Sequence, residues 1–277
     1  MASFASAGLR LAGRGVVFGY ALLILAPFVW IALSSFKSQI QILTNAMVFE
    51  PVLDNYIELL FSKSASFHRN IANSLVVAAA STLLALAIAA SAAFTLVRLP
   101  LPSWLRAAVF SWALLFHMLP TITFVGPWYV MLNSVGLTNS YVGLVLANVT
   151  HHLPMALWIV AAFMRDIPEE ILDAARIDGC DERSSFVRIV LPLVMPGLAA
   201  AGALVFLFSW NDFIVALNLT AAATRTAPVA IATFAQEHDV KYGEMAAGAM
   251  LTTLPALLLL LLGQRLIVRG LLSGAVK

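Results

Sequence analysis

Hydrophobic residues in this chain gather into long runs that are almost free of charge. Six of these runs are close to, or longer than, the roughly 20 residues that an α-helix needs to cross the hydrocarbon core of a bilayer. They cover approximately residues 16–36, 71–97, 105–132, 141–164, 193–217 and 246–268. The pattern predicts an all-α membrane protein with six transmembrane helices, forming a single transmembrane domain over residues 1–277.

The second predicted span contains a stripe of small residues. Ser81, Ala85, Ala89 and Ala93 recur at intervals of four. Lipid supplies no hydrophobic drive between helices, so small residues at this spacing allow helix backbones to approach closely. We interpret the stripe as a surface for helix packing.

Composition agrees with a membrane protein and excludes other classes. Hydrophobic residues make up 61% of the chain, charged residues only 11%, and the mean hydropathy is +0.93. A soluble domain carries about 25% charged residues. The net charge of +2 supplies no strong field for nucleic acid, and the single cysteine, Cys180, excludes an intrachain disulfide or a multi-cysteine metal site. We expect contact with membrane lipid, no nucleic-acid partner and no metal.

The basic residues orient the predicted spans. If both termini lie in the cytoplasm, eleven Lys and Arg residues are cytoplasmic and five are external. Cytoplasmic loops of membrane proteins carry an excess of Lys and Arg. The opposite topology would invert this ratio, so the sequence predicts a multi-pass protein with both termini in the cytoplasm.

A charged segment at residues 165–192 separates the fourth and fifth spans. Seven of the 14 acidic residues of the chain lie between positions 166 and 182. Asp166 and Glu169 have the spacing of a capping box, and Gly179 suits the left-handed position that ends many helices. The sequence therefore predicts two short helices joined at Gly179, in a loop at the membrane surface. Ala174 and Ala175 are expected to keep one side of this loop smooth.

The acidic start of this loop bears on what the loop contacts. A helix that lies on lipid headgroups is rich in Lys and Arg on its polar face. The first loop helix begins instead with Glu169 and Glu170. This difference favours a docking site for a partner protein over an ordinary amphipathic loop on the membrane surface.

The loop resembles the EAA loop of binding-protein-dependent ABC importer permeases. In that motif Glu-Ala-Ala is followed after three residues by Gly, after nine more by Ile, and one residue further by Leu-Pro. The matching positions here are Ala174, Ala175, Asp178, Gly179, Phe186, Ile189, Leu191 and Pro192. Asp173 stands where the family usually has Glu, which keeps the charge but shortens its reach.

The resemblance implies a fold, partners and a location. The fold would be that of a type I ABC importer permease, with a cytoplasmic coupling helix between helices 4 and 5, in the bacterial inner membrane. Its partners would be a second homologous permease, two ATPase subunits and a periplasmic or lipid-anchored binding protein. The residues that the resemblance assigns to ATPase coupling are Glu169, Glu170, Asp173, Ala174, Ala175, Asp178, Gly179, Phe186 and Pro192.

Similarity along most of the chain extends this interpretation to the solute. The six spans, the Ser-Trp-Asn-Asp-Phe run at 209–213, the Ala-Pro-Val loop at 227–229 and the tail at 270–277 are similar to MalG-like, maltose-type subunits of carbohydrate importers. This similarity implies transport of a sugar or sugar derivative. The alternatives are an importer permease for another small polar solute, an ion-coupled secondary transporter, and a membrane scaffold that transports nothing.

Sequence motifs of catalysis are absent. The chain contains no Gly-Lys-Ser/Thr and hence no Walker A phosphate loop. It also lacks His-Glu-x-x-His and the Gly-x-Ser-x-Gly nucleophile elbow. The sequence therefore predicts a transport subunit without catalytic residues or a cofactor of its own, and ATP with Mg²⁺ is expected on a separate ATPase.

Polar residues inside the predicted spans are candidates for the transport pathway. Ionisable groups at bilayer depth are costly and usually face a bundle interior or water. One polar group, which includes Thr150 and His152, precedes Pro154, a second flanks Pro120, and a third lies within the fifth run. The candidate pathway-lining residues are His117, Thr121, Asn148, His151, Trp210, Asn211 and Asp212. The alternative role is hydrogen bonding that fixes helix packing or satisfies backbone groups freed by proline.

Overall fold

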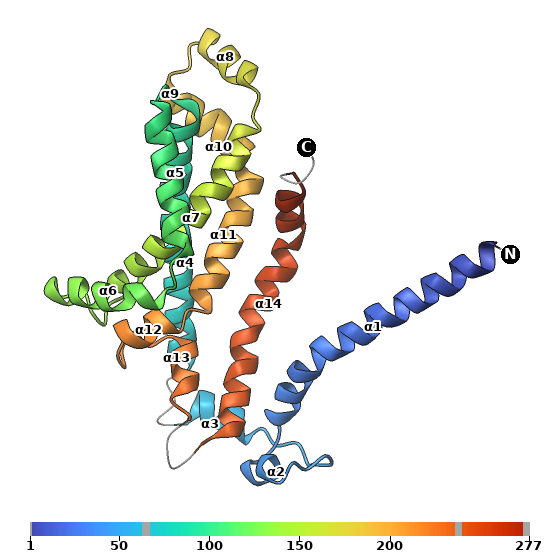
Figure 1. Cartoon of the computed structure of the whole chain (residues 1–277). Helices are drawn as coiled ribbons and strands as arrows, with labels where there is room; N and C mark the ends of the chain where they lie inside the picture. Colours follow the sequence, from blue (N-terminus) through green and yellow to red (C-terminus); the bar gives the residue numbers. More distant parts are fainter. Residues whose placement is uncertain (1, 63–66, 236–239, 274–277) are drawn as a thin grey trace. The chain divides into compact units, whose positions relative to one another are not determined.

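The computed structural model describes residues 2–62, 67–235 and 240–273 of the 277-residue chain. Within these ranges the chain is helical, with one isolated bridge between Ala235 and Val240 and no regular strand. The helices, drawn in Figure 1, are α1 (Ala2–Ser34), α2 (Gln39–Leu43), α3 (Asp54–Phe61), α4 (Phe67–Arg98), α5 (Ser103–Met118), α6 (Ile122–Ser134), α7 (Tyr141–Arg165), α8 (Glu169–Ile177), α9 (Glu182–Ser185), the π-helix η1 (Phe186–Val190), α10 (Leu191–Leu193), α11 (Met195–Trp210), α12 (Ile214–Leu219), α13 (Ala227–Ala232) and α14 (Tyr242–Ser273).

Membrane-spanning segments can be recognised among these helices. Four are long and apolar enough to cross a bilayer alone, and these are Gly13–Ser34, Phe67–Arg98, Tyr141–Arg165 and Tyr242–Leu261. Two bent helix pairs raise the number to six if each pair counts as one span. The all-α, multi-pass architecture predicted from the hydrophobic runs is therefore found in the described residues.

The hydrophobic run at 105–132 is divided into two helices. Helix α5 ends at Met118, α6 begins at Ile122, and the two axes differ by 103°. Pro120 has no amide hydrogen and disfavours the helical conformation of the residue before it. Leu119 accordingly takes an extended conformation, with φ −75° and ψ 135°. The single helix expected from hydrophobicity alone is thus broken by one proline.

The run at 193–217 is also divided. The segment Glu182–Leu193, which includes η1, meets α11 at 72°, and Val194 at the bend has a ψ of 4°. Pro196 lies in the first turn of α11, where its missing amide hydrogen removes no intrahelical bond. Helix α11 then ends at Trp210, and the separate short helix α12 follows.

The described residues fall into two compact units. The first comprises Met1–His68 and Ile231–Thr253, and the second comprises Arg69–Ala230 and Leu254–Lys277. In the first unit the buried Lys37 lies over the rings of Trp30 and Phe49, at 4.9 and 4.7 Å, and donates a 2.8 Å hydrogen bond to the carbonyl of Ala46. These contacts stabilise a charge that would be costly to bury alone.

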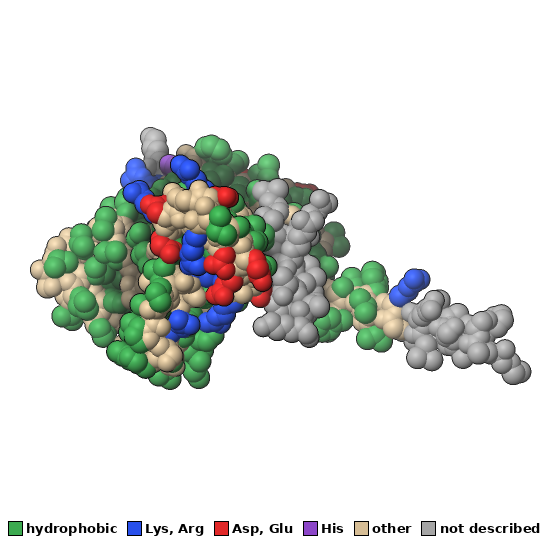
Figure 2. All heavy atoms as spheres, turned by 90° about the horizontal axis from the view of Figure 1, so that it is seen from above, with side chains coloured by type: hydrophobic (Ala, Val, Ile, Leu, Met, Phe, Trp, Pro, Cys, Tyr) green, Lys and Arg blue, Asp and Glu red, His purple; other side chains and the backbone are tan. Residues whose placement is uncertain are grey.

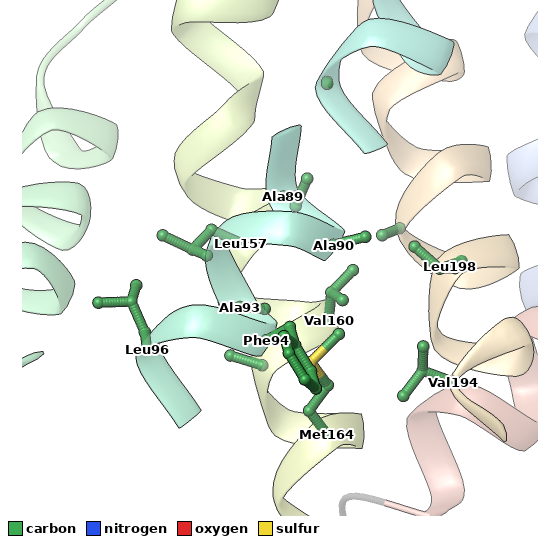
Figure 3. Packing of buried hydrophobic residues seen from close by; sticks show 14 of the residues in the cluster. Ala89, Ala90, Ala93, Phe94, Leu96, Leu157, Val160, Met164, Val194 and Leu198 are labelled. Atoms are coloured by element: carbon green, nitrogen blue, oxygen red, sulfur yellow. The ribbon is translucent and has the colours of Figure 1, made fainter. Parts of the chain in front are cut away.

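The core of the second unit is built on close helix packing. Ala85, Ala89 and Ala93 of α4 are fully buried against α7 and α11, as expected of the small-residue stripe. Figure 3 shows Phe94 of α4 and Met164 of α7 packed near Ala93. Helix α7 also packs against α5, so α7 is the central helix of this unit.

Substitution of Gly197 tests the packing between α11 and α7. A Cβ atom added at Gly197 would lie 2.9 Å from Cβ of Phe163 and closer to its ring, whereas one added at Gly126 of α6 would meet nothing within 4 Å. Overpacking of this kind costs about 1–3 kcal/mol. We expect Gly197→Ala to lower the thermal unfolding temperature of the purified protein in detergent and Gly126→Ala to leave it unchanged or higher. Equal unfolding temperatures for the two variants would contradict this packing.

Candidate functional site

A cavity of about 360 Å³ opens among α5, α7, α11 and α12. Its volume lies within the range of small-molecule sites, about 300–1,000 Å³. Most of its lining is polar or aromatic. The lining residues are His117, Thr121, Asn148, His151, His152, Phe208, Asp212 and Val215.

The break after α5 positions one polar edge of this pocket. Thr121 follows Pro120, and its Oγ1 lies 2.8 Å from Nε2 of His151 on α7. A continuous helix through residues 105–132 would carry Thr121 on along the axis of α5. The proline break therefore brings polar groups from two helices to one wall of the pocket.

Asp212 forms a second polar edge, just beyond the end of α11. Its Oδ1 accepts a 3.2 Å hydrogen bond from the amide of Val215, and its Oδ2 accepts one of 3.2 Å from the amide of Ala216. Asn148 of α7 lines the pocket beside this carboxylate, and its Nδ2 donates a 3.0 Å hydrogen bond to the carbonyl of Leu144. The first amides of a helix lack intrahelical partners. Asp212 thus satisfies the start of α12 while it lines the pocket.

Aromatic rings continue the wall between these polar edges. The His152 ring stacks on Phe208 with centroids 5.7 Å apart, and the His151 ring meets His152 edge-on at 5.0 Å. Beyond His151 lie Phe124 and Trp128 of α6, whose rings stack on each other. In the described part of the chain, no three His, Cys, Asp or Glu side chains converge as a metal site would require.

The pocket contains five of the seven residues singled out from the sequence as pathway-lining candidates: His117, Thr121, Asn148, His151 and Asp212. Trp210 is buried and stacks on Phe206, and the exposed Asn211 turns its amide back to the carbonyl of Leu207. His152, Phe208 and Val215 were not among the candidates. The i, i+4 spacing of His152 with Asn148 was the signal for His152, whereas Phe208 and Val215 look like ordinary lipid-facing or core residues.

The charged loop between α7 and α11 folds as two short helices around a glycine turn. The amide of Cys180 bonds to the carbonyl of Ala175, and the amide of Gly179 bonds to the carbonyl of Arg176. With Gly179 at φ +83°, these two bonds form a Schellman motif at the end of α8. Gly179 therefore ends the helix as the sequence predicts.

The start of the second loop helix is capped by a side chain. Asp181 accepts a 2.8 Å hydrogen bond from the amide of Ser184. Hydrogen bonds from the side chain and amide of Ser184 lower the pKa of Asp181. The carboxylate therefore remains charged at the exposed surface of the loop.

The start of α8 differs from the sequence prediction. Asp166 follows the last residue of α7 as its C-cap and does not cap α8, which begins after Pro168 without a side-chain cap. Ala174 and Ala175 also do not share one side of the loop as expected. Within α8, Ala175 is buried while Ala174 is exposed. A helix that lies on the bundle must turn successive residues to different faces, so the pair does not form one smooth side.

The outer face of the loop is charged and open. Glu169, Glu170, Asp173, Ala174, Asp178, Gly179 and Pro192 are exposed, whereas Phe186 packs inward on Phe94 with ring centroids 5.0 Å apart. Figure 2 shows acidic and basic side chains gathered over this end of the protein. Arg176 bridges Asp173 at 2.9 Å and Glu182 at 3.7 Å. Such exposed pairs contribute little stability, about 0–1 kcal/mol.

An arginine of another helix fastens the base of this loop. Arg98, the last residue of α4, donates from Nη2 to the carbonyl of Met164 and, at 2.5 Å, to the carbonyl of Ile167. These carbonyls lie at the end of α7 and just before α8, where intrahelical partners run out. Arg98 is one of the eleven basic residues that the sequence predicts to be cytoplasmic, but no local pattern reveals a partner 66 or 69 residues away.

The fold and these two sites define a class, a multi-pass α-helical membrane transport component with a charged loop at one end and a polar pocket between its helices. The chain belongs to the family of binding-protein-dependent transport system inner membrane components, whose family model matches residues 85–273. This match confirms the resemblance to importer permeases. It also confirms the prediction that the chain is a transport subunit and not an enzyme.

Individual relatives and a solved structure agree with this family. The chain is 37% identical over 266 residues to the trehalose transport system permease protein SugB of Mycobacterium tuberculosis (strain CDC 1551 / Oshkosh), covering 95% of this chain and 94% of that protein. It is 32% identical to the trehalose/maltose transport system permease protein MalG of Thermococcus litoralis (strain ATCC 51850 / DSM 5473 / JCM 8560 / NS-C), covering 93% of both. A chain of a bacterial ABC transporter involved in the import of the acidic polysaccharide alginate shares the fold, with a TM-score of 0.77 and 18% sequence identity. The match covers 93% of this chain and 95% of that chain.

Proposed function

We propose that this chain is a transmembrane permease subunit of an ATP-driven ABC importer that translocates a sugar or sugar derivative. The observation that carries the proposal is the exposed, charged loop closed at Gly179, at one end of the helices, in a chain of this family. The sugar is supported by the two relatives named for trehalose and maltose transport. An importer permease for another small polar solute is the alternative within the same family.

In this proposal the loop at 165–192 couples the permease to an ATPase. The exposed residues of α8 contact a groove of the ATPase subunit, which binds ATP and Mg²⁺. Movement of that groove passes through α8 to α7, because Arg98 and the buried Leu172 and Ala175 hold the loop to the helices. The pocket then lies on the pathway whose access alternates between the two sides of the membrane.

The complex in this proposal contains four further proteins. They are a second, homologous permease, two ATPase subunits, and a periplasmic or lipid-anchored binding protein that delivers the solute. Both termini of the chain lie in the cytoplasm of a bacterial cell, with the coupling loop on the same side. The positive-inside distribution of basic residues and the family supply the support for this orientation.

Cys180 offers a direct test of the loop, because it is the single cysteine of the chain, is partly exposed and follows Gly179. We expect a membrane-impermeant maleimide to label it in inside-out vesicles and not in intact cells or spheroplasts. Addition of the partner ATPase should slow the labelling several-fold, because a docked subunit covers the loop. Labelling is measured by gel shift of the tagged chain.

A matched pair of variants controls this test. Cys180→Ser removes the single thiol and should abolish maleimide labelling. The double variant Cys180→Ser, Ser103→Cys places the single thiol instead at an exposed position at the start of α5, outside the loop. The Ser103→Cys thiol should react from the same side of the membrane whether or not the ATPase is present. Labelling of Cys180 from the outside, or an equal rate with and without the ATPase, would contradict the proposed coupling role.

A further inference from the structure

We propose that the pocket lined by Thr121, His151, Phe208 and Asp212 is a contact site for one uncharged sugar ring of the transported solute. The inference rests on the proposed function, and it adds that this subunit itself recognises the solute and selects against acidic sugars. The pocket combines a few polar groups with aromatic walls, which is the usual make-up of a small-molecule site.

The first support is unused hydrogen-bonding capacity. Both oxygens of Asp212 already accept amide hydrogens, but a carboxylate offers about four acceptor positions, so it can accept further hydroxyl groups. His152 is more than nine-tenths buried, and its Nδ1, like that of His151, has no hydrogen-bond partner in the described part of the chain. Buried polar atoms in native proteins are rarely left unpaired, so unpaired nitrogens beside a cavity point to a polar ligand or ordered water.

The second support is the arrangement of the aromatic rings. Phe208 lies against the His152 ring and is one of the residues that line the pocket, and about half of its surface is exposed. An aromatic ring backed by a second ring presents a rigid apolar face. One face of a sugar ring carries mainly C–H groups, while hydroxyl groups project around its edge. The Phe208 face fits the former, and Thr121, His151 and Asp212 fit the latter.

The third support is the sign of the charge. Among the described residues that line the pocket, Asp212 supplies a carboxylate and none is Lys or Arg. A carboxylate of an acidic sugar placed in this pocket would be desolvated beside a charge of the same sign, with no cation to compensate it. An uncharged sugar avoids this penalty. The geometry therefore favours neutral sugars over uronic acids.

Binding to the full transporter complex without its binding protein tests the site. The probes are trehalose, which is neutral, and digalacturonate, which is acidic, each measured by saturation-transfer difference NMR on the complex in nanodiscs. We expect a signal from trehalose and none from digalacturonate. Thr121→Val should weaken trehalose binding about tenfold, because it leaves His151 without its partner and removes a hydroxyl. Phe208→Ala should weaken it by a similar factor.

Asp212→Asn supplies a gain of function that a purely structural role would not produce. Asparagine can still accept a hydrogen bond at the start of α12, and it removes the negative charge. We expect this variant to bind digalacturonate. Asn211→Ala is the matched control, because Asn211 is adjacent, exposed and bonded only to its own helix among the contacts described.

The outcomes separate this inference from the proposed function. If the wild-type complex accumulates trehalose with its binding protein but the pocket variants bind and transport as Asn211→Ala does, the sugar site is wrong and the transport function stands. Digalacturonate binding to the wild type that equals trehalose binding also overturns the inference. If the wild-type complex neither binds nor transports any sugar, the proposed function fails, and the sugar site fails with it.

Discussion

Replacing Gly179 with valine is expected to abolish solute uptake, while the chain still inserts into the membrane. Gly179 has a φ of +83°, a conformation that is open to glycine and strained for a β-branched residue. A Cβ atom there would meet nothing within 4 Å, so the defect comes from the backbone and not from crowding. The left-handed conformation costs other residues about 1–2 kcal/mol. Valine should therefore unwind the Schellman turn that joins the two loop helices.

The measurement is uptake by the reconstituted complex, together with its ATPase activity. With Gly179→Val, ATP hydrolysis should become independent of binding protein and solute, or the ATPase should fail to co-purify. Gly179→Asn is the matched control, because asparagine tolerates the left-handed region better than other residues. Wild-type uptake by the valine variant would refute a role for this turn in coupling.

Replacing Arg98 with methionine is expected to have the second largest effect, a several-fold loss of solute moved per ATP hydrolysed. The variant loses both hydrogen bonds to the carbonyls of Met164 and Ile167. A hydrogen bond from a charged group contributes about 1.5–3 kcal/mol. Without these two hydrogen bonds, the base of the loop can move independently of α4. Less of the motion of α8 would then be transmitted to the membrane helices.

Arg106→Met is the control for Arg98→Met. Arg106 is also a basic residue after the second span, but its Nη2 donates at 3.2 Å to the carbonyl of Leu101, only five residues away. Both substitutions remove one positive charge, but only Arg98→Met removes hydrogen bonds that join α4 to the end of α7 and the base of the loop. Equal ratios of solute to ATP for the two variants would show that charge alone accounts for the effect.

The helices and the loop are predictable from the sequence for identifiable reasons. Hydrophobic runs of membrane-spanning length report directly on the lipid environment, and the glycine at position 179 reports on a backbone conformation that other residues avoid. Both signals are local. The resemblance of the loop to the EAA motif was likewise carried by a few fixed positions within about twenty residues.

The features that the sequence does not predict share a physical cause, because they depend on contacts between distant parts of the chain. The sequence indicates only that polar residues flank Pro120. A proline in a hydrophobic run bends some spans slightly and breaks others, and here the bend is 103°. The sequence predicts two alternative roles for Asp212, lining the pathway or fixing helix packing. The structure assigns it to a helix start and to the pocket wall together, because α11 ends at Trp210.

Trp210 and Asn211 show the limit of composition as a guide to a pathway. Both belong to a polar cluster in the fifth hydrophobic run, yet one is buried in the core and the other lies exposed outside the pocket. Phe208 lines the pocket although it looks like a lipid-facing residue. The direction of each side chain depends on where the helix ends, and no local pattern marked that point.

The most direct test of the central claim is ATP-driven accumulation of radiolabelled trehalose in proteoliposomes. They would contain this chain with its partner permease and ATPases. We expect accumulation that requires ATP on the ATPase side of the membrane and binding protein on the other side, and that persists when ion gradients are collapsed. Uptake that needs an ion gradient and proceeds without ATP would contradict the account. It would make Asp212 and the histidines of the pocket an ion-coupling site in a secondary transporter.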